Sequence, residues 1–187
     1  MNKEEEIRAA ALKLFVEFGF HGTPTSKIAK EAGVANGTLF HYFKTKEDLI
    51  VALYNHTKDS LNRHLLETYN AENTLKDKMK NIYVSSLEWG LAHKPEFYFI
   101  QQFHFSPHLA KVSSEDIEKQ TRLHVELLRA GISENIFKPL PAQLISSILG
   151  GHVYGVYQYL ISTQLTPEKK AEMIEDTFGL LWAMLTK

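Results

Sequence analysis

The stretch Thr23–Leu49 reads TPTSKIAKEAGVANGTLFHYFKTKEDL, and its pattern decides the fold. Thr23 followed by Pro24 predicts the start of a short helix, with Thr23 as N-cap and proline at the first helical position, where its missing N–H costs nothing. Gly33 predicts the end of that helix, because glycine readily adopts the left-handed backbone of a turn. A second short helix is expected over residues 36–43. Two short helices joined by a glycine turn have the proportions of a helix-turn-helix.

The side chains of this stretch divide into an inward and an outward set. Ala29 and Ala32 are small enough to let two helices approach closely. Four apolar residues are expected to form a compact core with a preceding helix: Ile28, Val34, Leu39 and Phe43. The remainder of the second helix is then left to face outward: Asn36, Gly37, Thr38, Phe40, His41 and Tyr42. A short helix that begins with small and polar residues can enter the major groove of DNA.

Apolar residues recur at intervals of three and four along the whole chain, which predicts an all-α protein. Strand signals are missing, because no Asn-Gly dipeptide joins two alternating β-branched runs. About nine helices are expected, over residues 3–18, 24–32, 36–43, 46–69, 75–93, 96–105, 113–128, 141–162 and 167–185. Gly131 is expected to end the seventh helix. Thr45-Lys46-Glu47-Asp48 resembles a capping box at the start of the fourth.

The composition is that of a globular protein with a sizeable core, because 44% of the 187 residues are hydrophobic and 23% are charged. The absence of cysteine excludes disulfides and thiolate chemistry. The first six residues lack the basic and apolar regions of a signal peptide, and no run of about 18 apolar residues predicts a membrane span. A cytoplasmic protein is therefore expected.

Charge is unevenly distributed along the chain. The net charge is −1, but residues 20–46 contain four lysines and one glutamate, which is a local charge of +3. A local positive field on a mildly acidic protein can steer that segment toward phosphate groups. A solvated charge cluster is the alternative interpretation.

At these residues the chain resembles the TetR (tetracycline-repressor) family of bacterial transcription regulators. The resemblance covers about 50 residues, from Glu6 to Leu53, and rests on LFVEFGF, which begins at Leu14, and on the stretch quoted above. It implies an N-terminal three-helix DNA-binding domain over residues 1–47, with the helix-turn-helix motif at about 24–43. It also implies a helical ligand-binding and dimerisation domain over residues 48–187.

The resemblance assigns DNA-contacting positions. Thr38 matches a family threonine that contacts DNA, and Tyr42 and Lys46 match positions that bind phosphate, which positions a protein without reading sequence. The candidates for contact with base edges are Asn36, Gly37 and His41, since asparagine can form two hydrogen bonds with adenine. Further candidates for phosphate contact, at the positive end of the preceding helix, are Thr25, Ser26 and Lys27.

Three positions depart from the family pattern. Phe40 stands where the family usually has tyrosine, and it is still able to press on a thymine methyl group. Pro24 replaces a common threonine or serine. Ala35 replaces the serine that commonly caps the next helix, so Asn36 is either the substitute cap or a base-reading residue. These departures concern the operator sequence, and they leave the binding class unchanged.

The last two expected helices, 141–162 and 167–185, are apolar on more than one side. The resemblance implies that they pair with the same helices of a second copy, in a symmetric four-helix interface. The side chains expected in this interface are Ile145, Leu149, His152, Val156, Phe178, Leu181, Trp182 and Leu185. Burial inside one chain is the alternative.

Aromatic residues crowd the middle of the chain and are expected to line a largely apolar pocket for an apolar or aromatic small-molecule effector. The candidate lining residues are Trp89, Phe99, Phe103, His104, Leu123, Leu127, Tyr154 and Tyr157. A plain aromatic core is the alternative for each of them. No cofactor and no metal site are expected, because the nine histidines show no ligand spacing such as H-E-x-x-H.

Together these features predict a DNA-binding transcriptional regulator. The main hypothesis is a ligand-responsive repressor that binds a palindromic operator in double-stranded DNA as a homodimer and is released by a small molecule. The alternative is a regulator whose helical body binds a protein partner, or one that acts as an activator. An enzyme is not expected, because the sequence contains no nucleophile–base pair, metal motif or phosphate-binding glycine loop.

Overall fold

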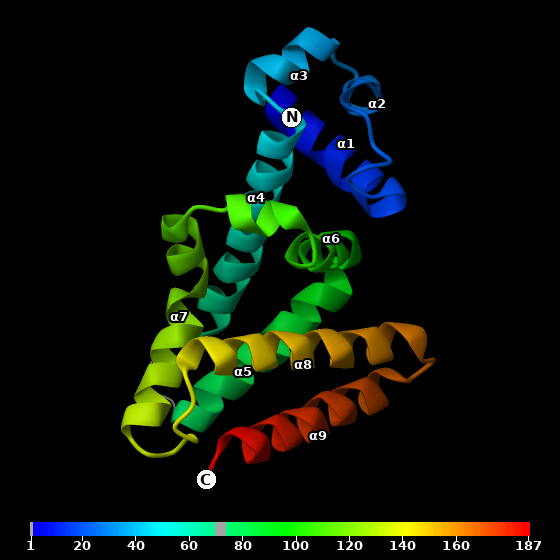
Figure 1. Ribbon diagram of the computed structural model, residues 1–187. Helices are drawn as coiled ribbons and strands as arrows, with labels where there is room; N and C mark the ends of the chain where they lie inside the picture. The colour runs from blue at the N-terminus through cyan, green and yellow to red at the C-terminus, as the bar shows by residue number, and fades with distance from the viewer. Residues whose placement is uncertain (1, 70–73) are drawn as a thin grey trace. The chain divides into compact units, whose positions relative to one another are not determined.

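A computed structural model describes residues 2–69 and 74–187, and these form helices joined by short connections (Figure 1). The elements are α1 (Lys3–Phe18), α2 (Thr25–Glu31), α3 (Asn36–Tyr42), α4 (Lys46–Thr68), α5 (Leu75–Ala92), α6 (Lys94–His104), the 3-10 helix η1 (Pro107–Lys111), α7 (Ser114–Ser133), α8 (Ala142–Ser162) and α9 (Pro167–Leu185). The all-α prediction is confirmed. None of the helices in the described ranges is long and apolar enough to cross a membrane.

The chain divides into two compact units, which are described separately. Unit 1 comprises Met1–Ser60 and His93–Asp116, and unit 2 comprises Leu61–Ala92 and Ile117–Lys187. Unit 1 therefore contains the helix-turn-helix, residues 46–60 of α4, and also α6 and η1. The functional boundary expected after residue 47 concerns DNA binding rather than compactness, and it stays a prediction.

An aromatic cluster forms the centre of unit 1. Phe15 of α1 and Phe99 of α6 are fully buried, and their rings stack with centroids 6.3 Å apart. Phe20 meets both rings edge-on, at 5.3 and 5.8 Å. Aromatic pairs of this geometry contribute about 0.5–1.5 kcal/mol each beyond the burial of their area. Because Phe99 completes this cluster, α6 packs on α1 although almost 80 residues separate them along the chain.

The connection from α1 to α2 is held by Thr23, and this differs from the expected role of that residue. The N-cap of α2 is Pro24, without a side-chain capping bond. The fully buried Thr23 hydroxyl instead lies 2.8 Å from the Gly19 carbonyl oxygen and 3.1 Å from that of Leu14, to which it donates. Gly19 ends α1 with φ 70°, as expected of a glycine at this position. The threonine thus ties the connection back to the end of α1.

In unit 2, α5, α8 and α9 pack against one another around buried apolar side chains (Figure 1). The Tyr83 hydroxyl of α5 donates to Thr177 Oγ1 of α9 at 2.9 Å, and its ring lies 5.7 Å from that of Phe178. Burial raises the pKa of Tyr83, and the hydrogen bond to Thr177 partly opposes this. The largely buried Tyr83 therefore keeps its hydroxyl satisfied inside an apolar core.

Helix α7 continues through Gly131 to Ser133, so the predicted end of this helix was wrong. Gly131 is buried, and a Cβ atom there would lie 2.3 Å from the ring of Phe137. The glycine therefore allows close packing of the fully buried Phe137 and does not turn the chain. The left-handed residue after α7 is Asn135, with φ 66°.

Replacing Thr23 with valine is expected to destabilise the protein by about 1–3 kcal/mol, because the shape is kept while a buried hydrogen bond is lost. The measurement is the midpoint of urea unfolding at unchanged slope. The matched control is Thr121→Val in α7, where the threonine hydroxyl only adds a second bond to the Ile117 carbonyl of its own helix. Equal midpoints for the Thr23 variant and the unaltered protein would contradict the assigned role.

Candidate nucleic-acid interface and ligand pocket

The turn between α2 and α3 has the geometry expected from its glycine. Gly33 has φ 67°, which confirms the predicted left-handed conformation. The Gly33 and Val34 N–H groups donate to the carbonyls of Lys30 and Ala29, at 3.1 and 3.0 Å. Ile28 of α2 and Leu39 of α3 are fully buried. These apolar anchors and turn bonds fix which side of α3 is left outside.

The outward side of α3 carries the residues that were predicted to meet DNA. Asn36, Gly37, Phe40, His41 and Tyr42 are exposed, and Thr38 is half-buried. The N-cap of α3 is Ala35, whose side chain cannot cap the helix, and Asn36 is the first helical residue. The alternative in which Asn36 caps this helix is therefore not what the structure shows. Its amide group remains available for an outside partner.

The start of α2 presents the second set of predicted phosphate contacts. Ser26 is exposed, while Thr25 and Lys27 are half-buried. The Lys27 Nζ atom lies 3.2 Å from the centroid of the Phe18 ring, which is a cation–π contact with the end of α1. This contact restricts the lysine side chain but leaves its charge in place.

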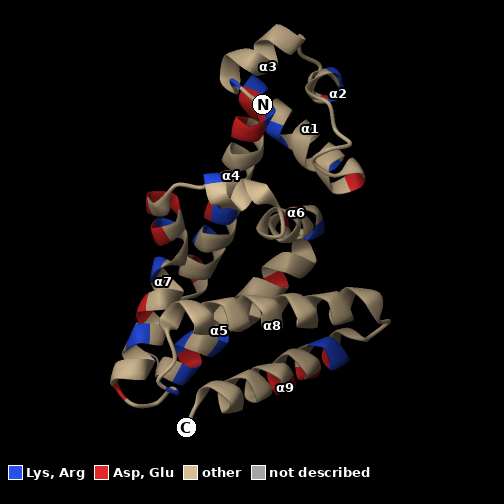
Figure 2. Ribbon diagram, viewed as in Figure 1, with Lys and Arg blue, Asp and Glu red and all other residues tan. Residues whose placement is uncertain are grey.

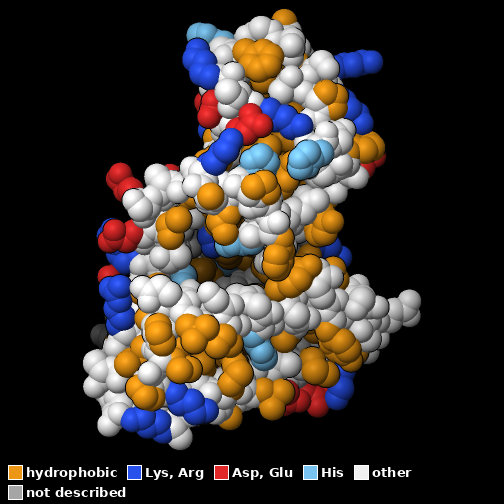
Figure 3. Space-filling model, viewed as in Figure 1, with side chains coloured by type: hydrophobic (Ala, Val, Ile, Leu, Met, Phe, Trp, Pro, Cys, Tyr) orange, Lys and Arg blue, Asp and Glu red, His pale blue; other side chains and the backbone are white. Residues whose placement is uncertain are grey.

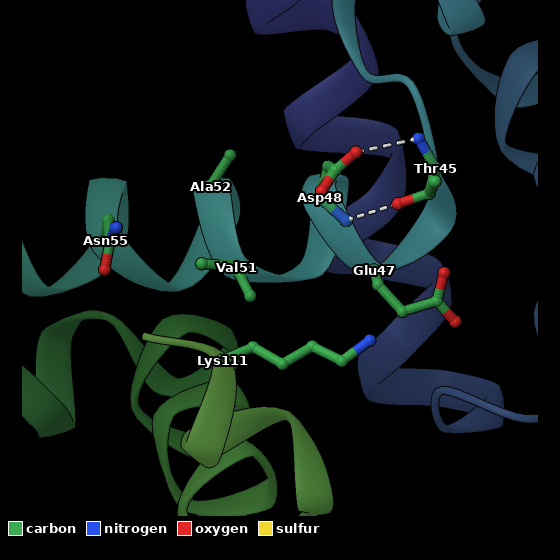
Figure 4. Close-up of a pocket in the computed structure, with 7 residues that line it drawn as sticks. All are labelled: Thr45, Glu47, Asp48, Val51, Ala52, Asn55 and Lys111. Atoms are coloured by element: carbon green, nitrogen blue, oxygen red, sulfur yellow. Dashed lines mark hydrogen bonds between the residues drawn. The ribbon is translucent and has the colours of Figure 1, made fainter. Parts of the chain in front are cut away.

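The capping box predicted at the start of α4 is confirmed (Figure 4). The Asp48 N–H donates to Thr45 Oγ1, and the Thr45 N–H donates to Asp48 Oδ2, each at 3.0 Å. Lys46, the predicted phosphate contact, is the first residue of α4 and is half-buried. The box therefore fixes the backbone from which Lys46 extends.

The count of +3 for residues 20–46 subtracts the charge of Glu31 from the charges of four lysines, but Glu31 is engaged by another residue. Glu31 is the single acidic residue among residues 20–46, and it forms an ion pair with Lys13 of α1. The hydrogen bond and the charge of Lys13 hold the pKa of Glu31 below its usual value. Lys27, Lys30, Lys44 and Lys46 thus lie in a segment whose one carboxylate is already neutralised. Figure 2 shows lysine and arginine on α1 and α2, around this part of unit 1.

A pocket of about 380 Å³ lies between the start of α4 and η1 (Figure 4). It is lined by Thr45, Glu47, Asp48, Val51, Ala52, Asn55 and Lys111. Three of its polar residues have partners within unit 1, because Thr45 and Asp48 bond each other and Asn55 Nδ2 donates to Asp116 Oδ2 at 3.0 Å. The bond between Asn55 and Asp116 joins α4 to the start of α7.

The residues predicted to line one aromatic pocket are distributed over both units. In unit 1, Phe99 belongs to the core, and Phe103 stacks on Tyr54 with ring centroids 3.9 Å apart. His104 Nε2 lies 3.5 Å from the Tyr54 hydroxyl oxygen. The other five predicted residues lie in unit 2, where Trp89, Leu127 and Tyr157 are buried and Leu123 and Tyr154 are half-buried. A lining role for these eight residues stays a prediction.

A second pocket, of about 360 Å³, lies within unit 2 between α4, α5 and α7. Its lining residues are Asn62, Leu65, Leu66, Ile82, Lys119, Gln120, Arg122, Leu123, His124 and Glu126. Leu123 is the one member that the sequence analysis proposed. The others were missed because the search followed aromatic residues, whereas this pocket combines leucines with charged residues at helical spacing on α7. Within the described ranges, no group of three or more potential ligands is placed to hold a metal ion.

The residues predicted for the dimer interface differ in how deeply they are buried. Ile145, Phe178, Leu181 and Leu185 are buried inside the chain's own core, so their side chains are not presented to a partner. Half-buried positions are occupied by Leu149, His152, Val156 and Trp182. The sequence pattern failed here because apolar periodicity marks burial without saying which surface covers the side chain. The interface itself stays a prediction.

Comparison with known proteins identifies the N-terminal segment. Residues 7–53 match the family model described as bacterial regulatory proteins, tetR family. Over 77 residues, 41% of this chain, the sequence is 38% identical to the fatty acid metabolism regulator protein of Bacillus subtilis (strain 168). This match covers 40% of the relative's length.

The fold of the whole chain also has solved counterparts. A crystal structure of a tetR family transcription regulator from Shewanella sp. PV-4 superimposes with a TM-score of 0.92 at 29% identity, and the match covers 100% of both chains. The structure of FadR from Bacillus subtilis in complex with stearoyl-CoA has a TM-score of 0.77 at 22% identity, covering 97% of this chain and 98% of that one, and it supports the fold alone. Residues 7–53 therefore match the N-terminal domain of the tetR family, and the chain as a whole shares its fold with a solved tetR family regulator.

Proposed function

We propose that this protein is a transcriptional repressor that binds a palindromic operator as a dimer and is released by a small molecule. The observation that carries the DNA-binding part is the exposed side of α3, which the Gly33 turn and the buried Leu39 hold in a lysine-rich segment whose one carboxylate, Glu31, pairs with Lys13. Figure 3 shows lysine and arginine side chains projecting from the surface at this end of unit 1. A short exposed helix flanked by lysines is the arrangement that enters the major groove.

Different side chains of this surface have different tasks in the proposal. Asn36, Gly37 and His41 approach base edges, where an asparagine amide can satisfy both the donor and the acceptor of adenine. Lys46 and Tyr42 contact phosphates, which fixes the position of the helix-turn-helix on DNA without reading the base sequence. The remaining predicted contacts, at the flanks of this surface, are Thr25, Ser26, Lys27, Thr38 and Phe40.

The dimer is supported by apolar side chains that the single chain leaves uncovered on α8 and α9. These are Leu144, Tyr159, Leu180 and Met184, and Leu180 is 68% exposed. Hydrophobic side chains also gather over α8 in Figure 3. Uncovered apolar side chains on two adjacent helices favour a symmetric helical interface. The helix-turn-helix motifs of the two protomers, placed about 34–36 Å apart or at a multiple of this spacing, would then bind the two half-sites of a palindrome.

Release by an effector is supported by the relatives, whose names include fatty acid metabolism regulator and FadR in complex with stearoyl-CoA. An effector releases a repressor only if it binds the two states of the protein with different affinity. A typical coupling of about 1–3 kcal/mol would change operator affinity about 5- to 150-fold.

The first test is a fluorescence-anisotropy titration of the protein against labelled DNA from upstream of its own gene. We expect sequence-preferring binding with a Kd of about 10⁻⁸ M or tighter at physiological salt. Scrambled DNA of the same composition is the control. Binding that is equal for both DNAs, or no binding up to micromolar protein, would refute the proposed function.

Substitution of Lys46 with alanine is expected to weaken binding to operator and scrambled DNA alike, because the lysine contacts phosphate. The slope of log K against log salt concentration is expected to flatten by about 1.8 for the dimer, because each of its two Lys46 side chains accounts for about 0.9, the value for one phosphate contact on B-DNA. Lys94→Ala, an exposed lysine at the start of α6, serves as the charge-matched control and should leave the slope unchanged.

Substitution of Asn36 with alanine is expected to lose preference at one base pair of each half-site, at a cost of about 1–3 kcal/mol. The measurement is the affinity for a set of operators that carry each base in turn. The salt slope should stay as in the unaltered protein, since no phosphate contact is removed. If Asn36→Ala and Lys46→Ala lose specificity to the same extent, the assigned roles are incorrect.

A further inference from the structure

The pocket in unit 2 has the size of a small-molecule site. Its volume of about 360 Å³ lies within the usual range of about 300–1,000 Å³ for ligand pockets. Residues of α4, α5 and α7 form its walls, so three helices of one compact unit contribute to it. A site built on helices rather than on a loop holds its lining residues in fixed relative positions.

Four of the residues that line this pocket are apolar. They are Leu65 and Leu66 of α4, Ile82 of α5 and Leu123 of α7. Leu66 remains 60% exposed although its three apolar neighbours in the pocket are half-buried. Covering such side chains with an apolar ligand is favourable by about 25 cal/mol per Å² of area removed from water. The pocket therefore favours a hydrocarbon portion over a fully polar ligand.

Two cationic side chains border the same pocket on α7. Lys119 and Arg122 are three residues apart, which places them on one side of the helix, and Glu126 is the one acidic residue of the lining. In the described ranges, none of the ion pairs of the chain includes Arg122. Its guanidinium group is therefore able to form a two-pronged contact with a carboxylate or phosphate.

The polar wall behind these cations is already fixed. Asn62 Nδ2 donates to the carbonyl oxygen of the buried Gln120 at 3.2 Å, which ties α4 to α7. His124 Nε2 lies 2.9 Å from Ser146 Oγ, which ties α7 to α8. Since these groups serve the fold, the charge of a ligand is left mainly to Arg122, which lines the same pocket.

We infer that this pocket binds an anionic amphiphile, with its hydrocarbon chain against Leu65, Leu66, Ile82 and Leu123 and its anionic group at Lys119 and Arg122. One part of this inference rests on the proposed function, namely that the bound molecule is the effector that releases the repressor. A cationic amphiphile would be repelled by the same two side chains, and a neutral one would gain nothing from them.

The test is isothermal titration calorimetry of the full-length protein alone, with decanoate as the probe and decyltrimethylammonium as the probe of equal chain length and opposite charge. We expect saturable decanoate binding that weakens with added salt, since the contacting charges are exposed. Binding of decyltrimethylammonium should be weaker. Butyrate, which keeps the carboxylate and lacks most of the chain, should show no binding over the same concentration range.

Three variants locate the site. Arg122→Glu should raise the Kd for decanoate about three- to tenfold, because an exposed attraction becomes a repulsion. Arg129→Glu is the matched control, since it lies exposed on the same helix outside the pocket, and it should leave the Kd unchanged. Leu66→Ser should weaken the binding of decanoate without affecting folding, because this leucine is largely exposed.

The possible results separate the inference from the proposed function. A Kd that is equal for the Arg122 and Arg129 variants, or equal for the two charged probes, overturns the assignment of this pocket. So does the absence of decanoate binding in a protein that still binds its operator, and the repressor proposal then survives with another site. Decanoate binding by a protein that shows no operator preference supports the pocket and refutes the repressor.

Discussion

The exposed side of α3 depends on the burial of the opposite side. A helix of seven residues is unstable in water by itself, because nucleation costs more than so few hydrogen bonds return. Leu39, which is fully buried together with Ile28 of α2, supplies the missing stabilisation. Gly33 makes that packing possible, since its left-handed backbone brings α3 back onto α2. The direction in which Asn36 and His41 point is thus a consequence of apolar packing on the other side.

The core of unit 1 extends this dependence beyond the helix-turn-helix. Phe99 of α6 completes the aromatic cluster with Phe15 and Phe20, so a helix from the middle of the chain stabilises the first helix. Thr23 adds a buried polar tie at the end of α1. A displacement of α6 would therefore disturb contacts on which the position of α1 depends.

Charge provides the second constraint on this surface. The chain as a whole is nearly neutral, so attraction to DNA has to come from the arrangement of a few lysines. The ion pair with Lys13 engages Glu31, the one carboxylate among residues 20–46, and the pKa of Glu31 falls because of that partner. On α7, too, a few cationic side chains set the local charge, because Lys119 and Arg122 line one pocket.

The sequence by itself determined the local features: the α-helices to within about two residues at each end except at the end of α7, the left-handed Gly33, and the capping box of Thr45 and Asp48. These follow from short-range rules of backbone geometry and hydrogen bonding that act within a few residues. Only the tertiary structure decided which apolar side chains are covered by the chain itself, as for Phe178. It also decided that Arg122 lines a pocket. Periodicity shows that a side of a helix is apolar, but contacts between helices distant in sequence decide what covers it.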